Sequence, residues 1–445
     1  MQSLRRILDN ESLKLLKNSS WVLFANFYST GLAFLRSVFI ARGLGASLFG
    51  SYAIIVSFVG MIQEFLNLNL GTALIRYGAG YQAAGRNDKL KALVVTCLRV
   101  SGVMLLVSVL VIIVLLEVDY RQFISSPGLE TYVIAYALAA GITYFNSISR
   151  SLLRLHYRFR ISSLIEMVMD TCETAAVAWV VWFHPKSLEA FFPTLIAVRF
   201  LNGFICNLAA FRELSDVLDV APDDSGASIK EDLSSIRNYV LVNSLGNTLK
   251  TLISQGDVLL LGLLASPVEV AFYVVAKKSA YAVLTLSDPL TSSVFPQLSK
   301  LLAERRYSDV KTMLKRVTLV GAVPAVIFFV TMLFLNKWLL ITVYGKEYAE
   351  SSASFMYFLT GALLGALTFW TLPLVQSLGI VRLRVVAYLT TIIIGAGLSF
   401  LLVPGYGARG MAIALLVTNI LNATIFILSS FRTLHKAETE GKAVI

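Results

Sequence analysis

The chain alternates between apolar runs of about 20 residues and short polar connections. An apolar run of that length crosses the hydrocarbon core of a bilayer as a helix, because each helical residue adds about 1.5 Å. The pattern predicts twelve transmembrane helices, at residues 19–41, 49–70, 92–116, 131–149, 161–183, 190–211, 238–261, 270–295, 317–335, 352–376, 385–403 and 411–431. We therefore expect an all-α, polytopic membrane protein.

Composition supports a membrane protein and gives its orientation. Apolar residues make up 57% of the chain and charged residues 15%, whereas soluble domains carry roughly 25% charged residues. In so apolar a chain, the net charge of +11 indicates basic residues that set the orientation in the membrane. It does not indicate binding to nucleic acid. With the N-terminus inside, the inside segments hold 26 of the 38 Lys and Arg residues and the outside loops hold 6. The positive-inside rule then places both termini in the cytoplasm.

The longest loop divides the chain into two halves that resemble each other. Residues 212–237 are acidic and serine-rich and predict a cytoplasmic linker. An N-terminal six-helix lobe at 1–211 precedes it, and a C-terminal six-helix lobe at 238–431 and a cytoplasmic tail at 432–445 follow. Tyr52 aligns with Tyr273, an offset of 221 residues, and residues 83–91 align with 303–311 after a one-residue slip. An even number of helices per half predicts a parallel repeat around a central cavity.

Polar residues follow one face of each of four predicted helices, at matched positions of the two halves. Residues 243, 247, 250, 254 and 257 recur at helical spacing, and the same offset leads to a small or polar face on the first helix. A second stripe, Lys278, Tyr281, Thr285 and Asp288, matches Ser57, Gly60, Glu64 and Asn67. We expect these faces to line the cavity, with the substrate-binding candidates Arg36, Lys250, Lys278, Asn26, Asn247, Glu64, Asn67 and Tyr281.

Charges inside the predicted spans need a partner, water or a function, because a charge at mid-bilayer costs at least about 2.5 kcal/mol. Arg36 and Asp257 hold repeat-equivalent positions. We predict that they form an inter-lobe gate, with Asp288 as a further member. A structural network of buried ion pairs is the alternative.

An acidic face marks the fifth predicted helix, where Glu166, Asp170 and Glu173 are spaced by 4 and 3 residues. Adjacent carboxylates in a low dielectric do not all ionise, so this face suits a proton or sodium relay that couples transport to an ion gradient. The alternative is simple pairing with Arg199 or Arg99, or, for Glu166, exposure near a helix end. The three histidines are widely separated, and we predict no metal site, no cofactor, no catalytic residue and no enzyme.

Three segments resemble a known family. The run Arg42-Gly43-Leu44-Gly45 followed by Phe49-Gly50-Ser51-Tyr52 is similar to the first helical connection of polysaccharide flippases. The segment Leu70–Arg76 and the turn Pro404–Ala412 are also similar to theirs. The chain thus resembles, over nearly its whole length, the Wzx-type branch of the multidrug/oligosaccharidyl-lipid/polysaccharide (MOP) exporter superfamily.

That resemblance implies a flippase that moves undecaprenyl-pyrophosphate-linked oligosaccharides across the inner membrane by alternating access. Its product would feed O-antigen, capsule or exopolysaccharide synthesis, with a polymerase and assembly proteins as partners. Basic cavity residues, here Arg36, Lys250 and Lys278, would engage the pyrophosphate. A MATE-like cation-coupled drug antiporter and a lipid II flippase are the alternatives within this fold. A membrane glycosyltransferase or polymerase is the alternative from another class.

Overall fold

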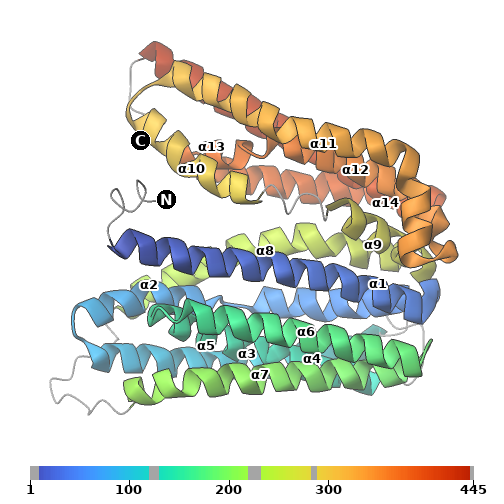
Figure 1. Ribbon diagram of the computed structural model, residues 1–445, viewed down its shortest axis with the longest axis horizontal. Helices are drawn as coiled ribbons and strands as arrows, with labels where there is room; N and C mark the ends of the chain where they lie inside the picture. The colour runs from blue at the N-terminus through green and yellow to red at the C-terminus, as the bar shows by residue number, and fades with distance from the viewer. Residues whose placement is uncertain (1–9, 120–129, 219–231, 282–287, 441–445) are drawn as a thin grey trace. The chain divides into compact units, whose positions relative to one another are not determined.

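The structure is a computed structural model that describes residues 10–119, 130–218, 232–281 and 288–440, and all regular structure in these ranges is helical (Figure 1). The helices are α1 (Asn10–Leu66), α2 (Leu70–Ala83), α3 (Asn87–Asp119), α4 (Glu130–Gly141), α5 (Thr143–Leu155), α6 (Phe159–Phe183), α7 (Leu188–Leu218), α8 (Leu233–Leu264), α9 (Pro267–Tyr281), α10 (Asp288–Ala303), α11 (Tyr307–Tyr344), α12 (Ser351–Thr368), α13 (Thr371–Ser377) and α14 (Val381–Glu440), with a 3₁₀ turn at Lys346–Glu350.

Six stretches of the described chain are long and apolar enough to cross a bilayer, so the chain is a multi-pass membrane protein. A helix satisfies its own backbone hydrogen bonds, which is why an apolar run in lipid folds as one. The stretches are Trp21–Ala83, Asn87–Glu117, Leu188–Ala210, Tyr307–Tyr344, Lys346–Thr368 and Leu383–Lys436.

Several helix boundaries differ from the predicted ones. Helices α1 and α14 each join two predicted spans through one residue of left-handed backbone, Gly45 (φ 73°) and Gly407 (φ 53°). The predicted span 49–70 instead stops at Leu66, and a new helix begins at Leu70 after Asn69 (φ 48°). The predicted spans 131–149 and 352–376 are each divided between two helices, α4 with α5 and α12 with α13.

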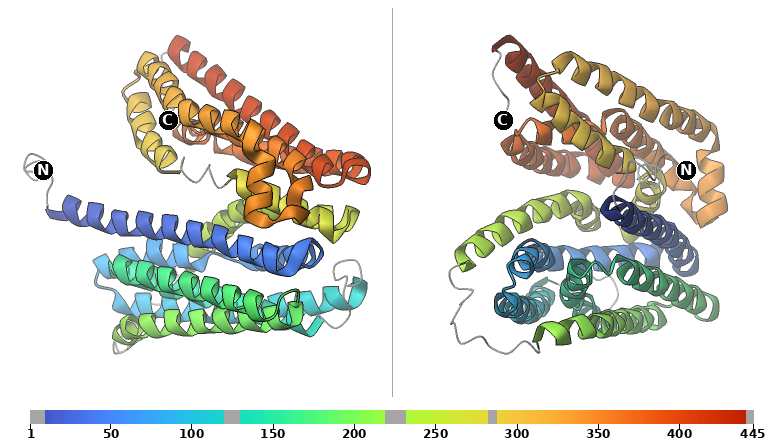
Figure 2. Two further views of the ribbon diagram at one scale, coloured as in Figure 1. Left: turned by 45° about the vertical axis from the view of Figure 1, so that its right-hand side comes forward. Right: turned by 60° about the vertical axis from the view of Figure 1, so that its left-hand side comes forward.

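The chain folds into two compact units. Unit 1 comprises residues 1–44 and 58–248, and unit 2 comprises residues 45–57 and 249–445. In unit 1, α5 contacts α2, α6 and α7, and α6 lies along α7 (Figure 2). In unit 2, α12 contacts α9, α11 and α14. Both central helices belong to the divided pairs, so the same kind of interrupted helix lies in the middle of each unit.

The repeat in the sequence has a counterpart in the turns of the two units. The turn after α2 has left-handed backbone at Gly85, and the turn after α10 has it at Arg305, an offset of 220 residues. The backbone N–H groups of Arg86 and Arg306 each donate to the carbonyl five residues earlier, both at 2.9 Å. Tyr157 and Gly379 form a second pair of left-handed turns, and Lys186 and Gly407 a third.

The apolar cores at these turns also correspond. Leu90 and Val94 are buried in a cluster with members on α2, α3, α5 and α8, and Val310 and Leu314 are buried in a cluster with members on α10, α11, α13 and α14. Each residue lies at the 220-residue offset from its counterpart. The two halves therefore fold around equivalent apolar positions.

Asp232 connects the start of α8 to the turn between α2 and α3. Its carboxylate accepts hydrogen bonds from Lys89 Nζ at 3.0 Å and from the Tyr81 hydroxyl at 2.9 Å. The Lys89 bond first, and the Tyr81 bond second, hold the pKa of Asp232 below its ordinary value of 3.8. Lys89 is almost fully buried, so losing this carboxylate removes a nearby opposite charge from an ammonium group in a poorly solvated position.

We expect Asp232→Asn to lower the melting temperature of the purified protein at neutral pH. A carboxyl whose pKa is lowered by folding stabilises the folded state above its unfolded pKa, and this contribution is lost as the pH falls through the folded value. The difference between the variant and the wild type should therefore shrink below about pH 4. A difference that stays constant from pH 7 to pH 3 would contradict the assignment.

Gly50 should not tolerate a side chain. A Cβ placed on Gly50 would lie 1.7 Å from the carbonyl oxygen of Pro267, a backbone atom of the same unit. Gly50→Ala should therefore destabilise the protein by about 1–3 kcal/mol, measured as a loss of thermal stability in detergent. Gly31→Ala is the matched control, because no atom lies within 4 Å of its added Cβ and alanine favours a helix.

Candidate functional site

The acidic face of α6 is paired with arginines from two other helices of unit 1. Arg36 Nη1, on α1, lies 2.7 Å from Glu173 Oε2 and 3.8 Å from Asp170 Oδ1. Arg150 Nη1, on α5, lies 3.6 Å from Glu166 Oε1. Less than a third of each of these side chains is exposed, so the attraction is only partly screened by solvent. The three predicted coupling residues thus meet two guanidinium groups.

The two arginines that the sequence offered as partners of this face have the following surroundings. Arg199 lies over the ring of Tyr136, 4.7 Å from its centroid, and Arg99 is exposed. Arg36 was predicted to face the cavity and a gate, and here it pairs with the acidic face. The Tyr28 hydroxyl and Thr171 Oγ1, at 2.8 Å, add a further contact between α1 and α6.

A second group of polar side chains gathers where α1 gives way to α2. Asn67 Nδ2 donates to Glu64 Oε2 at 3.3 Å, and Asn67 Oδ1 accepts from the backbone N–H of Asn69 at 2.9 Å. Asn243, on α8, donates to the hydroxyl of Thr72 at 3.0 Å. The interruption leaves backbone polar groups without helical hydrogen bonds, and asparagine side chains form hydrogen bonds with some of these groups. Discontinuous helices of this kind form binding sites in transporters.

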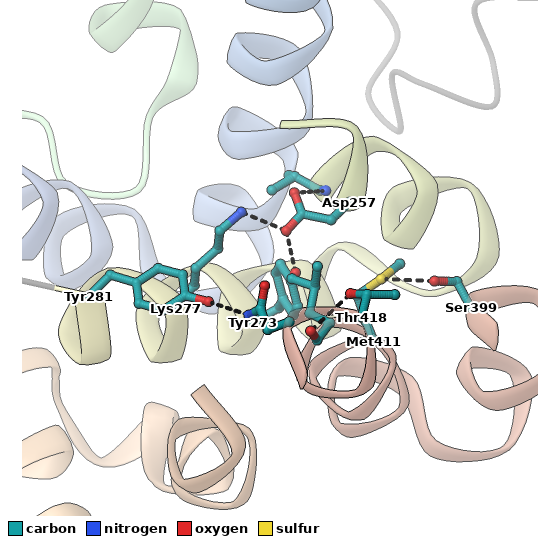
Figure 3. Close-up of polar contacts among 10 residues, drawn as sticks. Asp257, Tyr273, Lys277, Tyr281, Ser399, Met411 and Thr418 are labelled. Carbon is teal, nitrogen blue, oxygen red and sulfur yellow. Dashed lines mark hydrogen bonds and ion pairs between the residues drawn. The ribbon is translucent and has the colours of Figure 1, made fainter. Parts of the chain in front are cut away.

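In unit 2 a buried carboxylate connects α8 to α9. Asp257 accepts a hydrogen bond from the hydroxyl of Tyr273 and lies 2.5 Å from Lys277 Nζ (Figure 3). Its other oxygen accepts from the backbone N–H of Val258 at 2.8 Å. Asp257 is 5% exposed and Lys277 17% exposed, so the pair neutralises two charges in a setting of low dielectric.

Tyr281 lies one turn beyond Lys277 and joins α9 to α14 (Figure 3). Its hydroxyl oxygen accepts from Asn419 Nδ2 at 3.3 Å. Its ring meets Phe358 edge to face at 5.7 Å, and Tyr273 meets the same ring at 5.0 Å. Two hydroxyl-bearing rings are thus fixed on one face of α9.

The remaining predicted residues are placed as follows. Asn26 is exposed on α1, Asn247 is half-buried on α8, and Lys278 is exposed in the last turn of α9. Lys250 belongs to α8 and Asp288 begins α10, but the side chains of both lie outside the described part of the chain, as does Thr285.

Sequence reasoning missed three members of these groups. Arg150 has no role in the sequence analysis, yet it lies within α5 and pairs with Glu166. In the sequence analysis Tyr273 serves only to align the repeat, and Lys277 is not among the candidate residues. Tyr273 and Lys277 are spaced i, i+4, which places both on one helical face. That spacing was the available signal for a shared partner.

The pair of Arg36 and Glu173 can be tested by a double-mutant cycle. Arg36→Gln and Glu173→Gln should each lower thermal stability, because each leaves a partly buried charge without its nearest partner. The double variant should lose less than the sum, with a coupling energy of roughly 0.5–3 kcal/mol. Additive losses would contradict the pairing. Glu189→Gln, an exposed carboxylate on α7, is the control.

Comparison with known proteins identifies the family. A model of the polysaccharide biosynthesis protein family matches residues 15–302. A probable low-salt glycan biosynthesis flippase, Agl15 of Haloferax volcanii, is 21% identical over 431 residues, which cover 94% of this chain and 84% of the relative.

Solved structures show the same fold at low sequence identity. The inward-facing form of a multidrug resistance MATE transporter of the MOP superfamily has a TM-score of 0.69 at 13% identity, covering 92% of this chain and 96% of its own. The lipid II flippase MurJ, in an inward closed conformation, has a TM-score of 0.66 at 13% identity, covering 94% and 89%. The resemblance predicted from the sequence is confirmed: the chain belongs to the polysaccharide biosynthesis protein family and has the fold of the MOP superfamily.

Proposed function

We propose that the protein is a flippase that translocates lipid-linked oligosaccharides, with undecaprenyl pyrophosphate as the lipid carrier. The family match over residues 15–302 carries this proposal. The glycan flippase from Haloferax volcanii and the fold shared with a lipid II flippase support it. On this proposal the chain is a transporter of the inner membrane, with twelve crossings in two six-helix lobes and cytoplasmic termini. It would supply a polymerase and assembly proteins of surface polysaccharide synthesis.

The basic residues of the predicted cavity faces suit a diphosphate. A guanidinium or ammonium group binds phosphate oxygens through charge-assisted hydrogen bonds, and we assign this role to Arg36, Lys250 and Lys278. Glu64, Asn67, Asn26, Asn247 and Tyr281 would offer hydrogen bonds to sugar hydroxyls.

The contacts of Arg36 suggest how an ion gradient could drive transport. Glu173 and Asp170 hold its guanidinium, so a substrate phosphate must compete with them for it. Protonation of Glu173 would remove the nearer negative charge and release Arg36 to the substrate. Glu166 pairs with Arg150 and would take part as the neighbouring carboxylate on the same face.

We also propose that Arg36 and Asp257 form the inter-lobe gate. Arg36 and Asp257 each have an opposite charge within their own unit, Glu173 and Lys277. An inter-lobe pair between them, with Asp288 as a further member, therefore requires both residues to exchange partners during transport. Charge reversal at both positions should then restore activity that either single reversal removes.

A complementation experiment tests the flippase function. Cells that lack the protein should lose surface polysaccharide and accumulate the lipid-linked repeat unit on the cytoplasmic leaflet, and the wild-type gene should reverse both effects. Unchanged polysaccharide with increased sensitivity to cationic drugs would instead support an antiporter. Accumulation of the lipid-linked repeat unit on the outer leaflet would indicate that the protein is a polymerase.

The coupling proposal predicts a change of pH dependence and not only a loss of activity. In proteoliposomes, Glu173→Gln should mimic the protonated state, so flipping should lose most of its response to an imposed proton gradient. Asp170→Asn should have a smaller effect, because its carboxylate is farther from Arg36. Glu189→Gln is the control, and equal gradient dependence in Glu173→Gln and wild type would contradict the proposal.

A further inference from the structure

A groove of about 450 Å³ runs along the N-terminal part of α11 in unit 2. Six of its lining residues come from α11 itself: Lys311, Leu314, Lys315, Thr318, Leu319 and Ala322. Their spacings of 3, 1, 3, 1 and 3 place all six on one helical face. The face extends for about 17 Å, since a helix rises about 1.5 Å per residue.

The groove changes character along its length. Lys311 and Lys315 lie one turn apart at one end, and Leu319 and Ala322 lie at the other. Leu319 is 65% exposed, so the apolar end is open at the surface. α11 itself forms one of the apolar stretches long enough to cross a bilayer. Basic side chains at the end of a membrane helix can bind an anionic lipid headgroup, and the apolar face that follows can contact the acyl chain of the same lipid.

The opposite side of the groove is an aromatic pair. The Trp370 indole N–H donates to Thr318 Oγ1 at 2.7 Å, so its hydrogen-bonding group is already satisfied and the ring offers an apolar surface. Phe431, on α14, meets this ring edge to face at 6.2 Å. Trp370 is buried whereas Phe431 is 38% exposed. The buried ring of Trp370 therefore forms the base of the groove, and the partly exposed ring of Phe431 forms its apolar side.

The charge at the basic end is positive and incompletely compensated. Lys311 Nζ lies 2.7 Å from Glu438 Oε2 of α14. Lys315 is exposed, and no ion pair joins it to a described residue. The end thus holds two ammonium groups against one carboxylate, with the exposed Arg316 beside them.

We propose that this groove binds an anionic phospholipid, with its phosphate at Lys315 and Lys311 and its acyl chain along Leu319, Ala322 and Phe431. A free phosphate would use the lysines but gain nothing from the apolar wall. A volume of about 450 Å³ suits a ligand of drug-like size, comparable to a lipid headgroup with its glycerol and the first part of an acyl chain, the rest of which would continue into the bilayer. The groove is smaller than an oligosaccharide, so we assign it to a structural lipid and not to the transported substrate.

Binding of defined lipids to the full-length protein in detergent tests the proposal. Phosphatidylglycerol should bind more tightly than phosphatidylcholine by native mass spectrometry and should raise the melting temperature more. Lys315→Gln should weaken phosphatidylglycerol binding about fivefold, as expected for the loss of one basic residue near a lipid headgroup, and the double variant with Lys311→Gln should abolish the preference. Glu438→Gln should strengthen binding, because it removes the carboxylate that competes for Lys311.

Two further variants separate charge from shape. Lys300→Gln removes a lysine of α10 that is 76% exposed and should leave binding unchanged. Ala322→Phe fills the apolar end and should reduce binding of both lipids with the lysines intact. Equal binding of the two lipids, or equal loss in Lys300→Gln and Lys315→Gln, would overturn the proposal. So would displacement of phosphatidylglycerol by inorganic phosphate alone, or preferential binding of a polyprenyl phosphate, which would make the groove a substrate site.

Discussion

The cost of placing charge in an apolar medium organises the polar contacts within each unit. Arg36 and Arg150 approach the acidic face of α6 from two different helices, and Lys277 reaches Asp257 across the interface of α8 and α9. Each pair replaces part of the hydration that its members lose. Each also holds two helices in register, because an ion pair of this kind forms only when both helices present the right face at the same depth.

Helix interruptions form the second constraint. Backbone groups released at a break need partners wherever water is scarce. At Asn67–Asn69 the partners are asparagine side chains, and near the start of the helix after Gly407 the backbone N–H of Ala408 donates to the carboxylate of Glu269 at 2.6 Å. Near Gly45 the backbone N–H of Ala46 donates to Glu347 at 3.1 Å. Carboxylates at helix starts also match the positive end of the helix dipole.

Much of the helical framework could be predicted from the sequence, because an apolar run of spanning length has one favourable conformation in lipid. The grouping of Glu166, Asp170 and Glu173 on one face followed from spacing alone. Their partners did not, since periodicity fixes which residues share a face but not which neighbouring helix that face meets. The break at Asn67–Asn69 was missed for a related reason. Neither glycine nor proline marks it, and its stability comes from side-chain hydrogen bonds that only the fold brings together.

The two compact units are joined inside helices and not at loops. The chain passes from one unit to the other at Leu44–Gly45 and at Ser57–Phe58 within α1, and again at Thr248–Leu249 within α8. A loop can change direction at many residues, whereas a helix bends sharply only where a local cause such as proline or glycine interrupts it. Any change in the arrangement of the units must therefore pass through α1 and α8. Among these crossings in the described chain, Gly45 is the one position with left-handed backbone, so it is the position at which the helix direction already departs from regular α-helix.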